Sequence, residues 1–155
     1  MSANTTREQA ASALFALVTG AVPTLKRKER HFRLPQDVSA PQTPALFQVQ
    51  SQERYERQGK MRGIPPTRTM LFELLVYVTD AANTAAGITT VGSTQLNTII
   101  QAIETALTPP DATTGFSTLG GIVEHARIEG EIKYQEATEI DGLSIAIIPV
   151  SVLFP

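Results

Sequence analysis

The chain has 155 residues, no cysteine and a formal net charge of -2, with 42% hydrophobic and 18% charged residues. A chain of this size and composition is expected to fold as one globular domain over residues 1–155, with a core of its own. The lack of cysteine excludes disulfides and thiolate chemistry, and the nearly balanced charge argues against a general nucleic-acid or membrane binder.

The first predicted element is a helix over about residues 6–19. Thr5 and Glu8 have the spacing of a capping box, and apolar residues then recur at helical intervals until Gly20. The residues before this helix do not resemble an export signal, and no run approaches the roughly 18 apolar residues of a membrane-spanning helix. We therefore expect neither classical export nor membrane insertion.

A basic segment at residues 24–34 predicts a polar strand, and a proline-containing loop follows at residues 35–44. Two interpretations of the basic residues stay open. They could contact the phosphates of nucleic acid, or they could form a solvated strand that pairs with acidic residues of a neighbour. The five cations are Lys26, Arg27, Lys28, Arg30 and Arg33.

Two strands are predicted around a polar arm. Residues 45–55 alternate in polarity, which places Leu46 and Phe47 on opposite faces. Residues 70–78 are apolar on both faces except at Glu73, a pattern typical of a central strand. The polar stretch at residues 50–68 contains glycines and a proline pair, and it predicts a projecting loop or arm.

The second half of the chain begins with a loose connector at residues 79–92, and a second helix follows. Ser93 is a suitable N-cap, and the pair Pro109-Pro110 ends the helical pattern. The apolar residues of this helix are spaced to share one face, and they are Leu96, Ile99, Ile100, Ile103 and Leu107.

A long β-hairpin is predicted between Gly121 and Pro155. Asp141-Gly142 is the dipeptide that type I′ turns prefer, and a regular hairpin about it pairs Ile132 with Ser151. That register gives the hairpin a core face carrying Ile128, Ile132, Tyr134, Ile140, Leu143, Ile145, Ile147 and Leu153.

The last strand is apolar on its other face as well, where it carries Ala146, Ile148, Val150, Val152 and Phe154. We therefore expect that face to pack on a helix of this chain or on another subunit. Pro149 donates no ladder hydrogen bond and favours an edge or a bulge, and Gly130 in the partner strand is a candidate bulge position.

These elements predict an α+β fold, with a mainly antiparallel sheet, two principal helices on one face and the long C-terminal hairpin. No catalytic, cofactor or metal site is predicted. The two histidines, His31 and His125, lack zinc-site partners, and neither a phosphate-binding loop nor a serine nucleophile elbow is present. Glu73 could be buried, although a carboxylate more often faces solvent or a partner.

The order of these elements resembles phage tail terminator proteins, also called minor tail or tail completion proteins. The resemblance spans nearly the whole chain, and the segments that carry it are "APQTPALFQVQ", "FELLVYV", "LNTIIQAIETAL", "TLGGIVEHARIEGEI" and "IAIIPVSVLF".

The resemblance implies a non-enzymatic virion protein, assembled in the host cytoplasm, that forms a ring, usually a hexamer, at the head-proximal end of the tail tube. Its implied partners are the tail tube protein and the head-tail connector or head-completion protein. In such a ring the basic strand could line a DNA channel and contact genomic DNA transiently, although the family supplies no motif that fixes this role. The expected subunit interface comprises Ile148, Val150, Val152 and Phe154 of the last strand with Tyr55, Arg57 and Met61 of the arm.

Two alternatives stay open at this stage. The chain could be another protein of the phage neck, such as a head-completion or connector adaptor. A rival of a different class is a small cytoplasmic ligand-binding domain or a hydrolase without a recognised motif.

Overall fold

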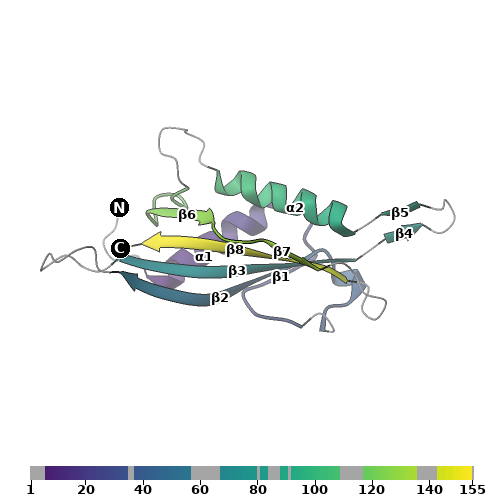
Figure 1. Cartoon of the computed structure of the whole chain (residues 1–155), viewed down its shortest axis with the longest axis horizontal. Coiled ribbons are helices and arrows are strands. Elements are labelled where there is room, and N and C mark those ends of the chain that lie inside the picture. The colour runs from purple at the N-terminus through teal and green to yellow at the C-terminus, as the bar shows by residue number, and fades with distance from the viewer. Residues whose placement is uncertain are drawn as a thin grey trace, which may run out of the picture.

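The computed structural model describes residues 6–34, 37–56, 67–79, 81–83, 88–90, 92–108, 117–135 and 143–154. Two long helices lie along one face of a six-stranded sheet (Figure 1), which confirms the predicted α+β fold. In chain order the elements are α1 (Arg7–Ala21), β1 (Arg27–Glu29), a 3-10 helix (Ala40–Gln42), β2 (Ala45–Glu56), β3 (Thr67–Thr79), β4 (Ala81–Asn83), β5 (Ile88–Thr90), α2 (Gly92–Leu107), β6 (His125–Ile128), β7 (Lys133–Gln135) and β8 (Leu143–Phe154).

The sheet has the strand order β1-β2-β3-β8-β6, and β7 also pairs with β8. Among the strand pairs of the described segments, β1 and β2 alone run parallel. The β3–β8 ladder is the longest regular pairing, since it runs without a break from Arg68 opposite Phe154 to Thr79 opposite Leu143. Because β3 lies between β2 and β8, the prediction of a central strand is confirmed.

The N-terminal elements differ slightly from their predicted bounds. Thr6, and not Thr5, caps α1: its hydroxyl accepts from the Gln9 amide at 3.1 Å, and the Gln9 side chain accepts from the Thr6 amide at 2.8 Å. The predicted basic strand shortens to the three residues of β1. Helix α2 begins at Gly92, so Ser93 lies inside the helix and is not its cap.

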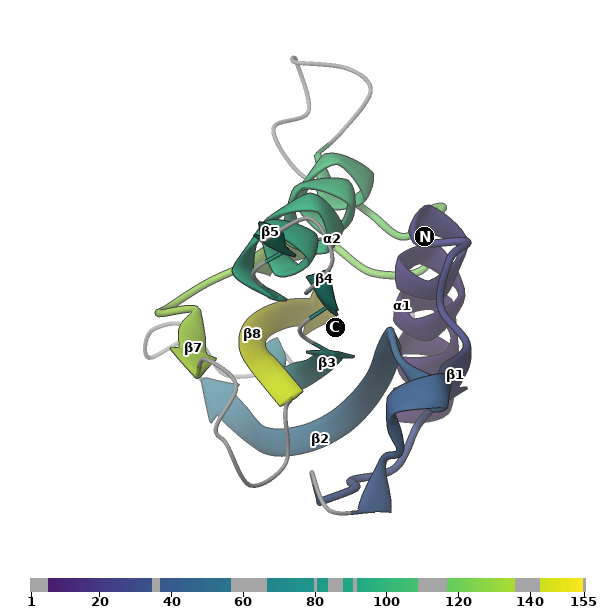
Figure 2. The same cartoon turned by 90° about the vertical axis from the view of Figure 1, so that its right-hand side faces the viewer.

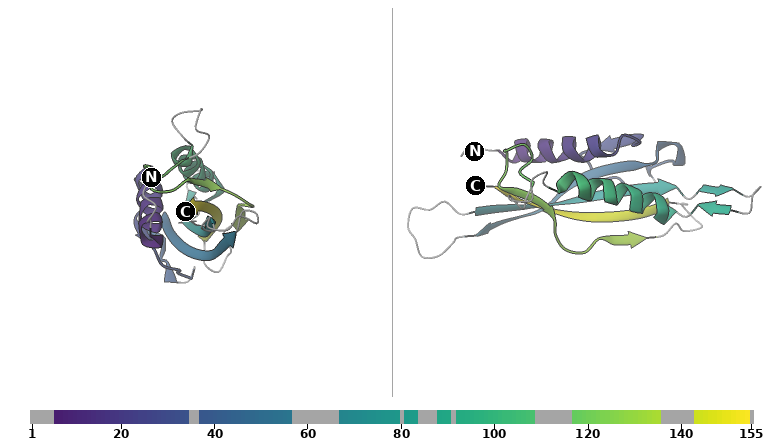
Figure 3. Two further views of the ribbon diagram at one scale, coloured as in Figure 1. Left: turned by 90° about the vertical axis from the view of Figure 1, so that its left-hand side faces the viewer. Right: turned by 90° about the horizontal axis from the view of Figure 1, so that it is seen from above.

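The main core lies between the helices and one face of the sheet (Figures 2 and 3). Alternate side chains of β3 and β8 point to this face, as the two-residue period of a strand requires. These strand residues are Met70, Phe72, Leu74, Val76, Val78, Ala146, Ile148, Val150 and Val152, and the helices meet them with Leu14, Val18, Leu96, Ile99 and Ile103.

The opposite face of the sheet is covered over only part of its length. A smaller buried cluster there joins Val38 to Phe47, Leu75, Tyr77 and Leu143, among other side chains of β2, β3 and β8. The Tyr77 hydroxyl donates to the carbonyl oxygen of Arg33 at 2.6 Å, which holds the covering segment against the sheet. Burial raises the pKa of this phenol.

Glu73 marks the end of the covered part. It lies half-buried on β3, opposite Val49 of β2 and Pro149 of β8. The carboxylate is therefore not fully buried, in agreement with the alternative that it faces solvent or a partner.

The predicted register of the C-terminal hairpin is wrong. Ser151 lies opposite Arg127 of β6, and not opposite Ile132, while Lys133 of β7 lies opposite Ile147. The offset is an odd number of residues, so the side chains of β6 and β7 share a face with the opposite set of β8 side chains from the one predicted. Ile128, for example, lies opposite Val150 on the helix side. The Asp141-Gly142 turn lies outside the described residues.

Pro149 and Gly130 mark a break between β6 and β7. The Pro149 carbonyl oxygen accepts from the Glu129 amide at 3.1 Å, so Pro149 presents its missing amide donor to the side of β6 and β7. The ladder is interrupted there between Ile128 and Lys133, and Gly130 adopts φ 109° beside the Pro149 ring. The register changes by an even number of residues across this break, so the odd offset from the predicted register already holds at β7 and does not arise at Gly130. Gly130 thus lies at an irregular position, as predicted, although the break is longer than the single extra residue of a simple bulge.

The second apolar face of β8 belongs to the core of the chain itself. Ile148, Val150 and Val152 are each 0% exposed beneath the helices, so the prediction that they form a subunit interface is wrong. The alternative expectation, packing on a helix, is confirmed. The side chain of Phe154 lies outside the described residues.

The predicted arm and connector both contain regular structure. β2 continues to Glu56 and β3 begins at Thr67, so the ends of the predicted 50–68 loop are paired strands, while Arg57 and Met61 lie outside the described residues. Within the predicted connector, β4 and β5 form a separate two-stranded sheet. It projects at the end of the molecule opposite to the tips of β2 and β3 (Figure 1).

Ile148→Asp is expected to lower the free energy of unfolding by more than about 4 kcal/mol, because it places a charge in the main core without a partner. Gln135→Asp is the control, since Gln135 is exposed on β7 and should change stability by about 0.5 kcal/mol or less. Urea unfolding followed by circular dichroism measures both. Equal stability of the two variants would contradict the observed faces of β8.

Gly130→Ala is expected to destabilise the fold by about 1–3 kcal/mol, because an alanine at φ 109° is strained although its Cβ has room beside Pro149. Gly20→Ala is the matched control. Gly20 lies in α1 with open space around it, so alanine there should stabilise by about 0.5–1 kcal/mol. Thermal unfolding of both variants gives the comparison, and a stabilising Gly130→Ala would rule out the bulge geometry.

Candidate binding groove on the open part of the sheet

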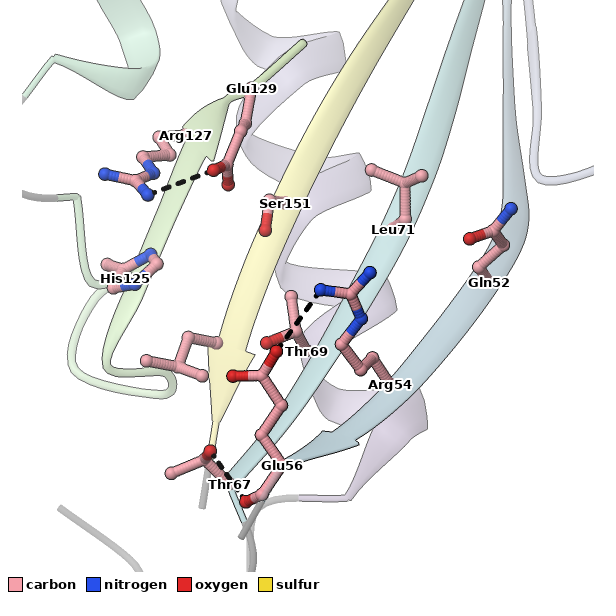
Figure 4. Close-up of a pocket in the computed structure, with 11 residues that line it drawn as sticks. Gln52, Arg54, Glu56, Thr67, Thr69, Leu71, His125, Arg127, Glu129 and Ser151 are labelled. Atoms are coloured by element: carbon pink, nitrogen blue, oxygen red, sulfur yellow. Dashed lines mark hydrogen bonds and ion pairs between the residues drawn. The ribbon is translucent and has the colours of Figure 1, made fainter. Parts of the chain in front are cut away.

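Beyond Glu73, the sheet face turned away from the helices carries a groove of about 400 Å³ (Figure 4). Its floor is formed by β3 and β8, and its two walls by β2 and β6. The strand registers place its side chains in two rows: Gln52, Leu71, Ser151 and Arg127 form one, and Arg54, Thr69, Leu153 and His125 form the other.

A bulge in β2 decides which residues reach the groove. The register between β2 and β3 shifts between Gln50 and Gln52, which leaves Ser51 as the extra residue. After this point Arg54 and Glu56 lie on the groove side, whereas Glu53 turns toward the helices opposite Met70.

Each wall of the groove carries an ion pair between residues two apart on one strand. Arg54 Nη1 lies 3.2 Å from Glu56 Oε1, and Arg127 Nη2 lies 3.2 Å from Glu129 Oε1. All four side chains are about half exposed or more, at 76%, 57%, 48% and 52% respectively. Exposed pairs of this kind contribute at most about 1 kcal/mol, so both arginines can exchange partners at little cost.

His125 opens β6 and lies half-buried at the groove wall. Burial lowers the pKa of its imidazole, and the positive charge of Arg127 lowers it further. Among the described residues, no group of three or more histidine and carboxylate side chains could hold a metal ion. The groove is suited to binding by hydrogen bonds and ion pairs.

The predicted DNA-contacting residues are largely engaged inside the chain. Arg27 and Arg33 both pair with Glu29, at 3.1 and 3.0 Å, and Arg30 pairs with Glu8 of α1 at 2.5 Å. Within the described part of the chain, Lys26 and Lys28 are the members of the basic segment that make no ion pair. The three arginines therefore pair with carboxylates of their own chain, and not with those of a neighbour as the second interpretation had it.

Tyr55 is the predicted interface residue that the structure leaves on the surface. It is 56% exposed near the tip of β2. Its hydroxyl accepts a hydrogen bond from Arg7 of α1, which also pairs with Glu53 at 2.8 Å. These contacts fasten the start of α1 to β2 and fix the position of the Tyr55 ring.

The groove residues were not singled out from the sequence. A usable signal was present in one strand, where polar and apolar residues alternate as His125-Ala126-Arg127-Ile128. Such alternation indicates one polar face. In β2 and β3 the residues between the groove positions are themselves charged, as Glu53 and Arg68 are, so no polar face could be identified there. That these strands lie side by side depends on the strand order.

Comparison with known proteins does not assign the chain to a family, since neither a family model nor a curated protein matches its sequence. Within the described segments, neither helix has the length and apolarity that crossing a bilayer requires.

The ion pair between Arg30 and Glu8 gives a pH-dependent prediction. Hydrogen bonds from Arg30, and then from Ser12, lower the pKa of Glu8 from 4.5 to about 2. Because the folded-state pKa is depressed, the stabilisation is complete above about pH 4.5 and disappears as the pH falls through about 2. NMR titration of the carboxyl carbons should show this pKa, and Arg30→Gln should raise it. Lys28→Gln is the control, and an equal effect of both variants would contradict the pairing.

Proposed function

We propose that this protein is a structural subunit of a phage virion, located in the tail or neck, which assembles as a ring at the head-proximal end of the tail tube. There it ends tube polymerisation and offers a joining surface to the head connector. The proposal rests on the order of elements quoted above and on the shape of the subunit.

The observation that carries the proposal is the presence of different projecting surfaces at the two ends of one subunit. The β2–β3 pair reaches one end, and the separate β4–β5 sheet projects from the other (Figure 1). An isolated two-stranded sheet is marginally stable in water, so β4–β5 is expected to rest on a partner. Two unlike surfaces per subunit are what a heterologous ring contact requires.

The buried face of β8 changes which surface is assigned to the ring contact. With Ile148, Val150 and Val152 inside the core, the subunit contact is expected at the ends of the molecule, with Tyr55 on one side of it. The arginines of the basic segment are ion-paired with glutamates of the same chain. Lys26 and Lys28 are therefore the residues of this segment best suited to a transient contact with DNA in the channel.

A connector or head-completion adaptor is the neighbouring alternative, because such a protein would also need two unlike surfaces. The two proposals differ in the partner. Purified protein mixed with tail tubes and, separately, with tail-less capsids should decorate one end of the tubes in negative-stain electron microscopy. Decoration of the capsids alone would reject the tail-terminator role and favour the adaptor.

Assembly is tested by size-exclusion chromatography with light scattering over a range of concentrations, with and without tail tubes. We expect higher oligomers of the 16.7 kDa chain. Tyr55→Asp should weaken assembly, because it places a charge in the expected contact, whereas Tyr134→Asp should not, although Tyr134 is exposed to a similar extent, 53% against 56%. A chain that stays monomeric in both conditions would overturn the ring.

A further inference from the structure

The floor of the groove presents polar groups that have no partner within the described residues. The hydroxyls of Thr69 and Ser151 and the amide of Gln52 line the groove, and none of them makes a hydrogen bond there. Because these groups face the groove, they are available to hydrogen-bond a ligand or water that enters it.

The charges of the groove follow a simple order along its axis. The central rows carry Arg54 on one wall and Arg127 on the other, and their intrachain partners Glu56 and Glu129 lie toward opposite ends (Figure 4). The centre of the groove is therefore positive and is bounded by a negative charge at each end. Leu71 and Leu153 add apolar contact between the two walls.

We propose that this groove is a docking site for an extended segment of a partner protein that carries one central acidic side chain. The carboxylate would lie between Arg54 and Arg127 and would accept hydrogen bonds from Ser151 and Thr69. Charge-assisted hydrogen bonds from arginine to a carboxylate are among the strongest polar contacts available to a protein surface. The apolar neighbours of the acidic residue would rest on Leu71 and Leu153.

The charge order selects this occupant over a nucleic acid. A nucleic-acid strand presents a phosphate at every nucleotide, so a strand that follows the groove would bring negative charges against Glu56 and Glu129. A single carboxylate meets only the central arginines. The site goes beyond the proposed ring, because all of its residues come from one chain and it would be present in a monomer.

NMR titration of the isotope-labelled full chain tests the proposal. The probe is a short acetylated and amidated peptide of alternating valine and threonine with one central glutamate, and the matched peptide has glutamine in its place. We expect shifts at the amides of the groove strands, and at least about tenfold weaker binding of the glutamine peptide, the factor that follows from losing a charge-assisted hydrogen bond.

Arg54→Gln and Arg127→Gln should each weaken binding of the glutamate peptide by about tenfold or more. Arg7→Gln is the matched control, because Arg7 is also an exposed, ion-paired arginine but contacts β2 from the helix side. The Arg7→Gln variant should bind the glutamate peptide as tightly as the unaltered chain does. The amide spectra of the free variants verify that each is folded, and assembly is scored separately by light scattering, so failure of the ring and failure of this site are distinguishable.

Three results would overturn the proposal. The first is equal binding of the glutamate and glutamine peptides, or no shift with either peptide at millimolar concentration. The second is binding of inorganic phosphate at the same amides as tightly as the peptide, which would indicate a site for a free oxyanion. The third is tighter binding of a single-stranded oligonucleotide at these amides, which would assign the groove to nucleic acid.

Discussion

The fold depends on the antiparallel ladder between β3 and β8. Both strands are apolar on both faces over most of their length, so each face must be covered for the pair to be stable. The two helices cover one face from Met70 to Val78 of β3 and from Ala146 to Val152 of β8, and the segment around Val38 covers the other face near Tyr77. The side chains become polar where this second cover ends, and the groove begins there.

A single proline shapes the edge of this ladder. Because Pro149 cannot donate a hydrogen bond toward β6 and β7, the chain leaves the ladder beside it and turns at Gly130. The register changes by an even number of residues across this interruption, so it leaves the faces unchanged: His125 and Arg127 lie on the groove side, while Ala126 enters the core. The bulge at Ser51 of β2 adds a single residue, and it therefore does change which side chains reach the groove.

Most charged residues of the N-terminal half act within the chain. Arg30 links the segment after β1 to α1 through Glu8, and Arg7 links α1 to β2 through Glu53. These exposed pairs add little stability individually, but they fix how the segments lie against one another. The ion pairs on the walls of the groove differ from these pairs. Each of them joins two residues of one short segment and does not link separate elements. Exchange of those pairs with a ligand would leave the fold intact.

Several features could be predicted from the sequence: the two helices, the central position of β3, the opposite faces of Leu46 and Phe47, and the α+β class. Each follows from the periodicity of apolar residues within one segment, which shows whether one face or both faces of an element are buried. Pro149 and Gly130 were identifiable as irregular positions. The register of β6 and β7 against β8 could not be predicted, since an odd slip of a strand exchanges its two faces and the position at which the chain re-enters the ladder has no local signature. The burial of Ile148 follows from the pairing of β8 with β3 beneath the helices, and the groove follows from the order of four strands. Both depend on pairings between segments that are distant in the sequence.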